Sequence, residues 1–169
     1  MGSQQGKFAG LHVRYTQPSD AFKLKEWLSD QDGGCWFPID GEVELNDAVV
    51  RWLSFHRYQC SITVLKDEVP CGIATLYLQP YAKLSHQCEF GILVDKKYRN
   101  QHVGTYLMSC LMHLAKEKFA IEILHLTVYE NNPAIKFYHK FGFVEFGRQK
   151  GWIKEKDGSY GRVFMERLL

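Results

Sequence analysis

The stretch Val94–Gly104, with the sequence VDKKYRNQHVG, is the part from which the fold of this chain can be predicted. It follows the apolar run CEFGIL and precedes TYLMSCLMHLAKEKF, in which apolar residues recur at helical spacing. The pattern predicts a buried strand that passes through a short basic turn into an amphipathic helix. The first N–H groups of such a helix lack intrahelical acceptors, and the helix dipole favours an anion there. Because Lys96, Lys97 and Arg99 add positive charge, the turn indicates a site for a phosphate-bearing ligand.

A second segment, Val128–Phe143, reads VYENNPAIKFYHKFGF, and the two segments together resemble the acetyl-CoA-binding motifs of the GNAT superfamily of N-acetyltransferases. The family turn reads (Gln/Arg)-x-x-Gly-x-(Gly/Ala), which this chain matches from Arg99 to Gly104 except that His102 stands at the first glycine. The second family segment reads Asn-x-x-Ala-(Ile/Leu)-x-(Leu/Phe)-Tyr-x-Lys-x-Gly-Phe. It is matched at Asn131, Ala134, Ile135, Phe137, Tyr138, Lys140, Gly142 and Phe143.

This resemblance implies an α/β (α+β) GNAT fold, with a mixed, mostly antiparallel central sheet flanked by helices. It also implies that acetyl-CoA is the co-substrate and that an acetyl group passes directly to a primary amine. Residues 1–10 are expected to be a flexible N-terminal segment, and residues 11–169 a single GNAT acetyltransferase domain. No cysteine lies beside a histidine as an obvious nucleophile, which disfavours an acyl-enzyme intermediate.

The order of apolar and turn-forming residues predicts the remaining elements. A loop is expected from residue 30 to Asp47, with helical spacing resuming at Ala48. Pro133 fits the start of a short helix with Asn132 as its cap, and Gly142 fits the left-handed position that ends it. The predicted strands are 11–16, 59–67, 68–79, 86–95, 121–130, 143–153 and 159–169, and the other helices are 21–30 and 103–119.

Acetyl-CoA is expected, from the resemblance, to bind along the strand and around the basic turn. The backbone N–H groups of the turn would hold the pyrophosphate, and the pantetheine arm would add alongside the strand. Asn131 either contacts CoA or caps the following helix. The residues expected to bind acetyl-CoA are Ile92, Leu93, Val94, Arg99, Asn100, Gln101, His102, Val103, Gly104, Thr105 and Asn131.

His102 is the departure from the family turn. Glycine serves such a turn because its φ is unrestricted and its backbone can approach phosphate closely. Either the backbone at His102 keeps ordinary dihedrals or the affinity for CoA falls. The imidazole either donates to a phosphate oxygen or is a surface side chain on the first helical turn.

Two residues are candidates for catalysis. The resemblance implies that Tyr138 protonates the leaving thiolate, since a phenol with a pKa of about 10 stays protonated at neutral pH; spacing alone favours a core tyrosine. Glu89 is a lone carboxylate in an apolar strand, and it either takes the amine proton through water or lies at a solvated strand edge. The ribosomal N-terminal acetyltransferase branch of the family has a glutamate base in the next strand, where this chain has Leu126.

The acceptor is less constrained than the donor. The loop 30–47 carries Asp30, Asp32, Asp40, Glu42 and Glu44 around Trp36 and Phe37. One interpretation is an acidic, aromatic pocket, and on this ground a small cationic amine is slightly favoured as the acceptor. The other, which we favour for the loop itself, is a solvated segment whose aromatic residues fill the core. The alternative functions are a catalytically silent CoA-binding or interaction module, protein N-terminal acetylation and transfer of a longer acyl chain.

Composition and charge exclude several other classes of protein. The chain has 169 residues, 46% of them hydrophobic, and a net charge of +2, which is typical of a globular domain and gives no strong attraction to nucleic acid. The absence of a long apolar run favours a cytoplasmic protein that does not bind membranes. Five cysteines without a Cys-x-x-Cys pair are expected to be reduced, and the scattered histidines predict no metal site. The expected partners are acetyl-CoA and an amine acceptor, with a homodimer as a family habit.

Overall fold

The computed structural model describes residues 8–31 and 34–169. Residues 1–7 of the predicted flexible segment 1–10, and Asp32 of the predicted acidic loop, lie outside the described residues. The ring of Phe8 packs on Tyr106, with 5.2 Å between ring centroids. In the part of the chain that is described, no helix is long and apolar enough to cross a membrane.

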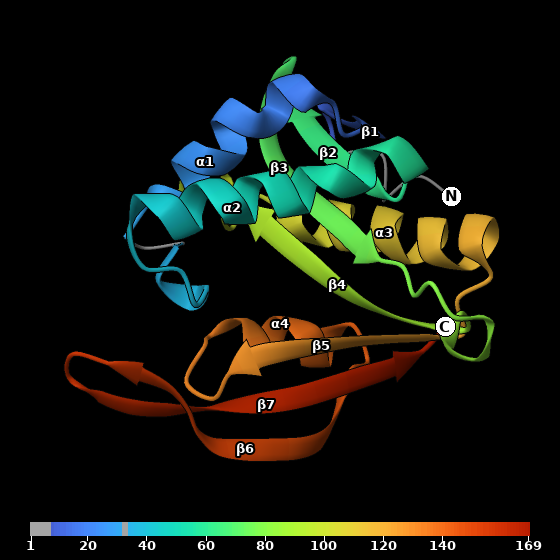
Figure 1. Ribbon diagram of the computed structural model, residues 1–169. Coiled ribbons are helices and arrows are strands. Elements are labelled where there is room, and N and C mark those ends of the chain that lie inside the picture. The colour runs from blue at the N-terminus through green and yellow to red at the C-terminus, as the bar shows by residue number, and fades with distance from the viewer. Residues whose placement is uncertain (1–7, 32–33) are drawn as a thin grey trace.

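A seven-stranded sheet in the order β1-β2-β3-β4-β5-β7-β6 forms the centre of the molecule (Figure 1). Neighbouring strands are antiparallel except for β4 and β5, which are parallel. The predicted mixed, mostly antiparallel sheet is therefore confirmed. The strands are β1 Leu11–Tyr15, β2 Ser61–Lys66, β3 Val69–Tyr77, β4 Gln87–Val94, β5 Ile123–Tyr129, β6 Val144–Glu155 and β7 Gly158–Leu168.

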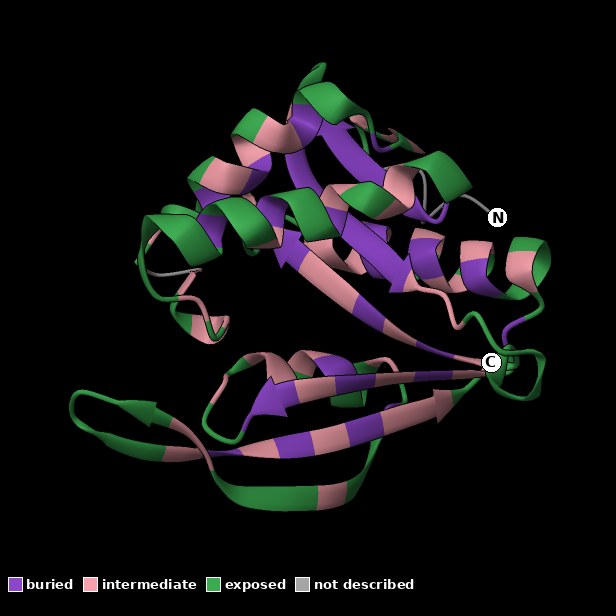
Figure 2. Cartoon of the chain, in the orientation of Figure 1, coloured by how far each residue is buried: buried purple, intermediate pink, exposed green. Residues whose placement is uncertain are grey.

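Helices cover both faces of this sheet. The helices α1 (Ala21–Ser29) and α2 (Gly41–Leu53) lie on the face toward the viewer in Figure 1, and α3 (Val103–Phe119) and α4 (Ala134–Lys140) lie behind the strands. Because successive side chains of a strand point to opposite faces, each layer has its own apolar core. Figure 2 shows the buried residues concentrated in β2 and β3, between the two helical layers, whereas buried and intermediate residues alternate along β4 and β5. Short 3-10 turns lie at Pro18–Asp20, Gly34–Trp36, Ser54–Tyr58, Ala82–Leu84 and Lys96–Tyr98.

The predicted loop up to Asp47 is wrong in its second half, because α2 already begins at Gly41. The carboxylates of Glu42 and Glu44 lie in the first turn, where the helix dipole favours negative charge, and Glu44 accepts a hydrogen bond of 2.7 Å from the Asp40 N–H. Leu45 then packs into the core with α1. Glycine and acidic residues suggested a loop, but at a helix N-terminus the same residues are favourable.

A buried ion pair ties β1 to the start of α1. Both terminal nitrogens of Arg14 donate to Asp20 at 2.8 Å, and Asp20 also accepts from the Gln17 N–H and the Thr63 hydroxyl, each at 2.9 Å. Burial alone would raise the pKa of Asp20, but these hydrogen bonds and the charge of Arg14 outweigh it and hold the pKa below its ordinary value. The carboxylate is thus a fully bonded part of the core.

The two halves of the sheet separate between β4 and β5. These strands pair only where Gln87–Glu89 meets Ile123–His125. Beyond that point β4 stays paired with β3 as far as Val94, and β5 stays paired with β7 as far as Tyr129. A wedge therefore opens in the middle of the sheet, and Figure 1 shows the two strands diverging from a common end.

Candidate active site

A cleft of about 930 Å³ occupies the wedge between β4 and β5. One wall is formed by β4 and the turn before α3, and the other by the end of β5 and by α4. Trp36 and Phe37 approach from the opposite face of the sheet, so the opening passes between the two strands. Its lining includes Phe90, Gly91, Ile92, Leu93, Val94, Arg99, Asn100, His102, Gly104, Thr105, Leu126, Thr127, Val128, Asn132, Pro133, Ala134, Lys136, Phe137, Tyr138, Lys140 and Phe141.

Beyond Glu89, the edge of β4 that faces β5 pairs with no strand of the described residues. Residues Ile92, Leu93 and Val94 lie on this part of β4 and line the cleft, as predicted for the strand that receives pantetheine. An open strand edge offers backbone N–H and C=O groups at regular spacing to an extended ligand. The geometry therefore suits an arm that carries amide groups.

The turn before α3 takes the shape of a glycine turn despite its sequence. His102 has φ 63° and ψ 2°, and Asn100 has φ 60°, so both adopt the left-handed conformation. Histidine and asparagine occur there more often than most residues, at a cost in strain. Of the two alternatives for His102, ordinary dihedrals are therefore excluded. Its exposed side chain borders the cleft.

The N-terminus of α3 is directed at the cleft. The Tyr106 N–H donates to the His102 carbonyl at 2.9 Å, so the amides of Val103, Gly104 and Thr105 precede the first full helical bond. A Cβ added at Gly104 would find its nearest neighbours, Phe137 and Val94, at 3.7 Å. The fold itself would accept a side chain there, so the free space beside this glycine is available to a ligand.

Positive side chains surround this end of the cleft. Arg99 from the turn, and Lys136 and Lys140 from α4, are all among its lining residues. The family turn led to Arg99, whereas the two lysines were not predicted to bind a ligand because their place opposite the turn depends on the packing of α4. Together with the helix N-terminus, these cations form a site suited to phosphate groups.

Tyr138 reaches the cleft from α4. Its ring packs edge-on to Phe90 at 6.2 Å and to Phe143 at 6.0 Å, and the residue is buried. Burial raises the pKa of its phenol to about 12. The hydroxyl is therefore a hydrogen-bond donor over the whole physiological pH range.

Glu89 lies at the closed end of the wedge. It is directly opposite Tyr77 of β3 and His125 of β5, so the three side chains form one row across the face that bears α1 and α2. Burial, and then the charge of Glu89, raise the pKa of Tyr77. Burial lowers the pKa of His125, against the opposing charges of Glu89 and Glu166. His125 was not singled out from the sequence because its proximity to Glu89 depends on strand register.

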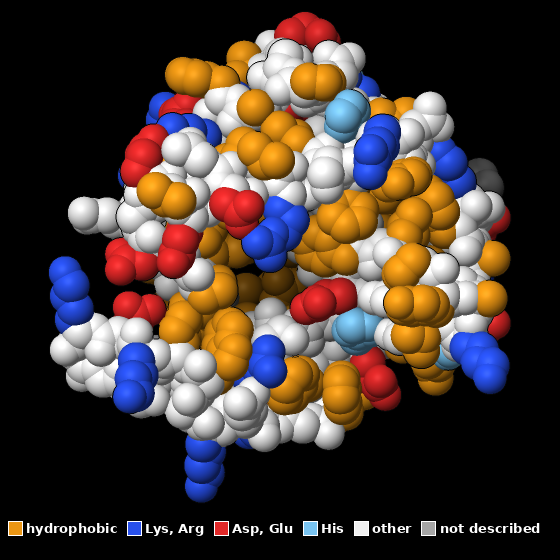
Figure 3. Space-filling model, viewed as in Figure 1, with side chains coloured by type: hydrophobic (Ala, Val, Ile, Leu, Met, Phe, Trp, Pro, Cys, Tyr) orange, Lys and Arg blue, Asp and Glu red, His pale blue; other side chains and the backbone are white. Residues whose placement is uncertain are grey.

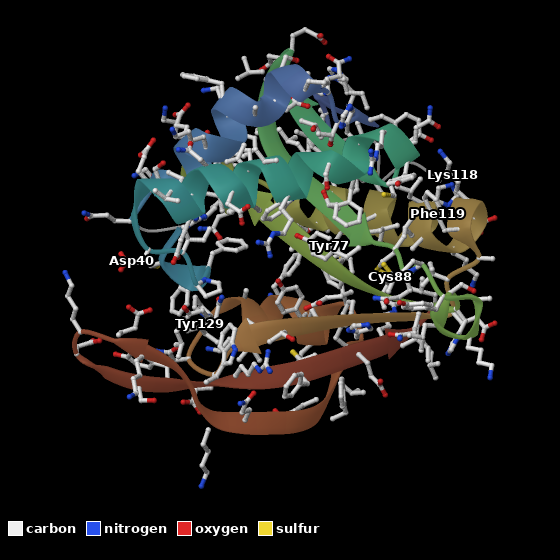
Figure 4. All side chains as sticks on the ribbon, viewed as in Figure 1. Asp40, Tyr77, Cys88, Lys118, Phe119 and Tyr129 are labelled. Carbon is white, nitrogen blue, oxygen red and sulfur yellow. The ribbon has the colours of Figure 1, made fainter. Side chains whose placement is uncertain are left out.

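The same face continues over β5, β7 and β6, where no helix covers it (Figure 1). Figure 3 shows a hollow between α2 and these strands, lined mainly by hydrophobic side chains. In Figure 4, Tyr77 lies on the upper wall of this hollow and Tyr129 at the end of β5 on the lower wall. The Tyr129 ring packs edge-on to Trp36 at 6.0 Å and to Trp152 at 5.2 Å. The face beside the wedge is thus open and partly aromatic.

None of the described carboxylates of the predicted acidic loop is among the residues that line the cleft. Asp30 pairs with Lys96 at 2.6 Å, and Glu42 pairs with Lys25 at 2.5 Å. Asp40 is exposed at the end of the loop (Figure 4), and Glu44 is exposed in the first turn of α2 and accepts from the Asp40 N–H. The aromatic residues of the loop, in contrast, do reach the cleft. The described part of the loop thus follows the second interpretation, a solvated acidic segment with inward aromatic residues.

Three predicted acetyl-CoA residues have side chains outside the lining of the cleft. Val103 is buried in the core, and the Gln101 side chain bonds to the Lys97 carbonyl and to Lys66, so only their backbones are placed for a ligand. Asn131 is exposed. Its neighbour Asn132 lines the cleft and accepts a 2.8 Å hydrogen bond from the Ala134 N–H, as predicted for the cap.

Comparisons with known proteins agree with this geometry. The family model described as acetyltransferase (GNAT) family matches residues 8–143. The L-amino acid N-acetyltransferase AaaT of Escherichia coli (strain K12) is 33% identical over 137 residues, which are 75% of this chain and 85% of that relative. Among solved structures, a ribosomal-protein-alanine N-acetyltransferase from Brucella melitensis superposes with a TM-score of 0.80 at 20% identity, covering 94% of this chain and 99% of that one. The structure of yncA from Salmonella typhimurium with its cofactor acetyl-CoA has a TM-score of 0.77 at 16% identity, covering 95% and 94%.

Proposed function

Because this chain belongs to the GNAT family of acetyltransferases and uses acetyl-CoA as its acetyl donor, we propose that it transfers the acetyl group directly to the primary amine of a small molecule. One observation carries the proposal. The open edge of β4, the N-terminus of α3 and the Tyr138 side chain all meet in a single cleft. These are the parts that a thioester donor with a pyrophosphate requires.

The donor would lie along the wedge with its pyrophosphate at the turn. The amides of Val103, Gly104 and Thr105 would donate to phosphate oxygens, with Arg99, Lys136 and Lys140 supplying positive charge. The pantetheine amides would bond to β4 from Ile92 to Val94. This alignment would bring the thioester to the closed end of the wedge, near Tyr138 and Glu89.

Holding the reactants in line is the main source of rate in such a transfer. Well-oriented intramolecular reactions gain about 7–11 kcal/mol relative to free reactants. The neutral amine nitrogen attacks the thioester carbonyl carbon, a C–N bond forms and the C–S bond breaks; the nitrogen loses a second proton to become the amide, and a proton from solvent is taken up by the departing thiolate. An ammonium acceptor first loses a proton, for which Glu89, through water, is our candidate base, and CoA leaves as the thiol.

Tyr138 would act on the leaving sulfur as a hydrogen-bond donor. Its pKa of about 12 lies above that of a thiol. Because the phenol stays protonated, it can donate to the sulfur as negative charge develops there, and this stabilises the departing thiolate.

The small-molecule acceptor is supported by the open face. A hollow flanked by Tyr77, Tyr129 and Trp152 suits a compact, partly apolar amine. The Escherichia coli relative is named as an L-amino acid N-acetyltransferase. Protein N-terminal acetylation has less support, because Leu126 stands where the ribosomal branch has its base. A preference for polyamines has less support, because no described carboxylate of the loop lines the cleft and two of them, Asp30 and Glu42, are paired with lysines.

Calorimetric titration with acetyl-CoA, followed by a thiol-release assay with a panel of amines, tests the proposal. We expect saturable micromolar binding of acetyl-CoA, much weaker binding of ATP, and CoA release only when an acceptor is present. Binding without turnover by any amine would favour the silent CoA-binding module. Faster turnover of a longer acyl-CoA in competition would identify a different acyl donor.

A further inference from the structure

Arg162 is a cation on the open acceptor face that the chemistry described above does not use. It lies on β7 directly opposite Tyr129 of β5. Its neighbours Val163 and Met165 belong to the core beneath α3, so the side chains of Arg162, Phe164 and Glu166 face the hollow. Figure 3 shows a Lys or Arg side chain among hydrophobic ones on the lower wall of the hollow.

The guanidinium of Arg162 is held by aromatic rings. Its central carbon lies 5.0 Å from the centroid of Trp152 and 4.7 Å from that of Phe164, and its Nε donates to Gln149 at 2.8 Å. Stacking and the Nε bond fix the plane of the group while its terminal amino groups stay available. Among the described residues, no carboxylate forms a salt bridge with Arg162. The nearby Glu130 is engaged with the Gly161 N–H at 2.6 Å.

A second, independent group points to a ligand at the same place. The Tyr129 side chain is almost completely buried, and its hydroxyl makes no hydrogen bond of ordinary geometry with a described residue. Burial, and then the charge of the nearby Glu155 carboxylate, toward which the hydroxyl can donate, raise the pKa of Tyr129 to about 12, so the hydroxyl remains a donor. A buried hydroxyl without a well-formed hydrogen bond, beside an available guanidinium, favours an anion that accepts from both and that competes with Glu155 for the hydroxyl.

The opposite end of the face carries the complementary charge. Glu89 and Glu166 flank His125 in the row at the closed end of the wedge. Arg162 and Glu166 are four residues apart on one strand, about 13 Å at roughly 3.3 Å per residue. The contact of the guanidinium with Phe164 shows that it leans toward that row. A short zwitterion with its ammonium toward Glu89 and its anionic group toward Arg162 matches this polarity.

We propose that Arg162 and the Tyr129 hydroxyl form a carboxylate-binding subsite, so that the acceptor is an α-amino acid or a close analogue. This inference rests on the proposed function. A planar guanidinium presents two parallel N–H donors to a carboxylate, which would orient the amine toward the thioester. The aromatic side chains Trp36 and Trp152 on either side of Tyr129 would receive an apolar side chain of the acceptor.

Matched acceptors with and without a carboxylate test the subsite. With acetyl-CoA saturating, kcat/KM is measured for L-phenylalanine against phenethylamine and for L-leucine against isoamylamine, with spermidine as a polyamine probe. The wild-type protein should favour each amino acid by about 100-fold, in line with the loss of one partner of a desolvated charged contact. Equal kcat/KM values for each amino acid and its matched amine, or a preference for spermidine, would overturn the inference while leaving the proposed function intact.

Variants then assign the effect to Arg162. Arg162→Gln should lower kcat/KM for the amino acids about 100-fold, mainly through KM, and leave the values for phenethylamine and isoamylamine within about two-fold. Arg162→Lys should restore part of the loss, because lysine keeps the positive charge but lacks the two parallel N–H donors of the guanidinium. Arg148→Gln, in an exposed arginine of the same hairpin paired with Glu145, is the matched control and should change nothing. Equal losses with both kinds of acceptor would show that Arg162 is only structural.

A wild-type protein that acetylates none of these compounds would count against the proposed function, and binding then decides the subsite. L-Phenylalanine and L-leucine are titrated into the complex with desulfo-CoA. Saturable binding that is lost in Arg162→Gln and kept in Arg148→Gln supports the subsite. Absence of binding to the wild-type complex overturns it.

Discussion

His102 holds a left-handed backbone conformation at the point where the helix N-terminus meets the cleft. Strain at such a residue costs about 1–2 kcal/mol. A glycine at the same position removes this strain but loses about 0.5–1 kcal/mol more chain entropy on folding. We therefore expect His102→Gly to raise the free energy of unfolding by roughly 0.5–1 kcal/mol, measured from denaturant midpoints at an unchanged m value.

Titration with acetyl-CoA separates the imidazole from the backbone. His102→Ala removes the side chain but keeps the strain. If the imidazole contributes to phosphate binding, both variants should bind acetyl-CoA more weakly. If the backbone alone forms the cradle, His102→Gly should bind as well as the wild-type protein or more tightly. A lower stability of His102→Gly would contradict the strain argument.

A substitution of Tyr138 should change the turnover rate without changing the affinity for acetyl-CoA. Tyr138→Phe keeps the ring among Phe90 and Phe143 but removes the donor to the leaving sulfur. We expect kcat to fall about 100-fold with the Kd for acetyl-CoA unchanged, since the interaction forms only as the thiolate develops. Tyr81→Phe, at an exposed tyrosine, serves as the control. Unchanged turnover would remove Tyr138 from the chemistry.

Among the elements, α3 and β4 each contain a glycine whose surroundings differ. A Cβ at Gly104 would meet nothing closer than 3.7 Å, whereas a Cβ at Gly91 would lie 2.5 Å from the Tyr77 hydroxyl and 3.2 Å from Trp52. Gly104→Ala should therefore leave the free energy of unfolding unchanged or raise it by up to about 1 kcal/mol. It should also weaken acetyl-CoA binding about ten-fold, because the methyl group occupies the phosphate approach; ten-fold is about 1.4 kcal/mol.

Gly91→Ala should show the reverse pattern in stability. The added methyl group is too close to Tyr77 and Trp52, so the free energy of unfolding should fall by about 1–3 kcal/mol. Chemical denaturation of both variants, together with acetyl-CoA titration, checks the pair. A destabilised Gly104→Ala variant with normal binding would contradict the assignment of that space to a ligand.

The contact between β1 and α1 makes stability depend on pH through Asp20. Its pKa is lower in the folded chain than in the unfolded one, so the unfolded state binds more protons in acid. Its contribution is complete above the unfolded pKa of about 3.9 and is lost as the pH falls through the lower folded pKa. Asp20→Asn should lower the free energy of unfolding by about 3 kcal/mol at neutral pH. The free energy of unfolding of this variant should also fall less steeply in acid than that of the wild-type protein, as measured by denaturation from pH 7 to about 2.

The elements were largely predictable from the sequence because each depends on local patterns. Apolar periodicity gave the strands and helices, and the residues around Asn132 and Gly142 gave the ends of α4. The start of α2 was missed because acidic residues favour both loops and helix N-termini. Of the site, the turn and Tyr138 followed from local motifs. The row of Tyr77, Glu89 and His125, and the place of Arg162, depend on strand register, which a single sequence does not specify.

At the scale of the whole molecule, acetyl-CoA should connect two halves whose strands pair only at the closed end of the wedge. One half is built on β1–β4 and the other on β5–β7 with α4. At a hundred times its Kd, the ligand should raise the free energy of unfolding by about 2.7 kcal/mol. Hydrogen exchange should slow on both walls together, in β4 beyond Glu89 and in α4, with little change in β1. Protection of one wall alone would contradict binding within the wedge.

The parting of β4 from β5 also has a mechanical consequence. A sheet resists shear through its ladder of interstrand bonds, and here the ladder between the halves contains only the pairs from Gln87–Glu89 to Ile123–His125. The backbone link between the two halves is therefore short, and the rest of their contact is made by side chains of the apolar core that they share. A force that pulls the halves apart would load this short ladder and that core, and a donor bound to both walls would add a further link.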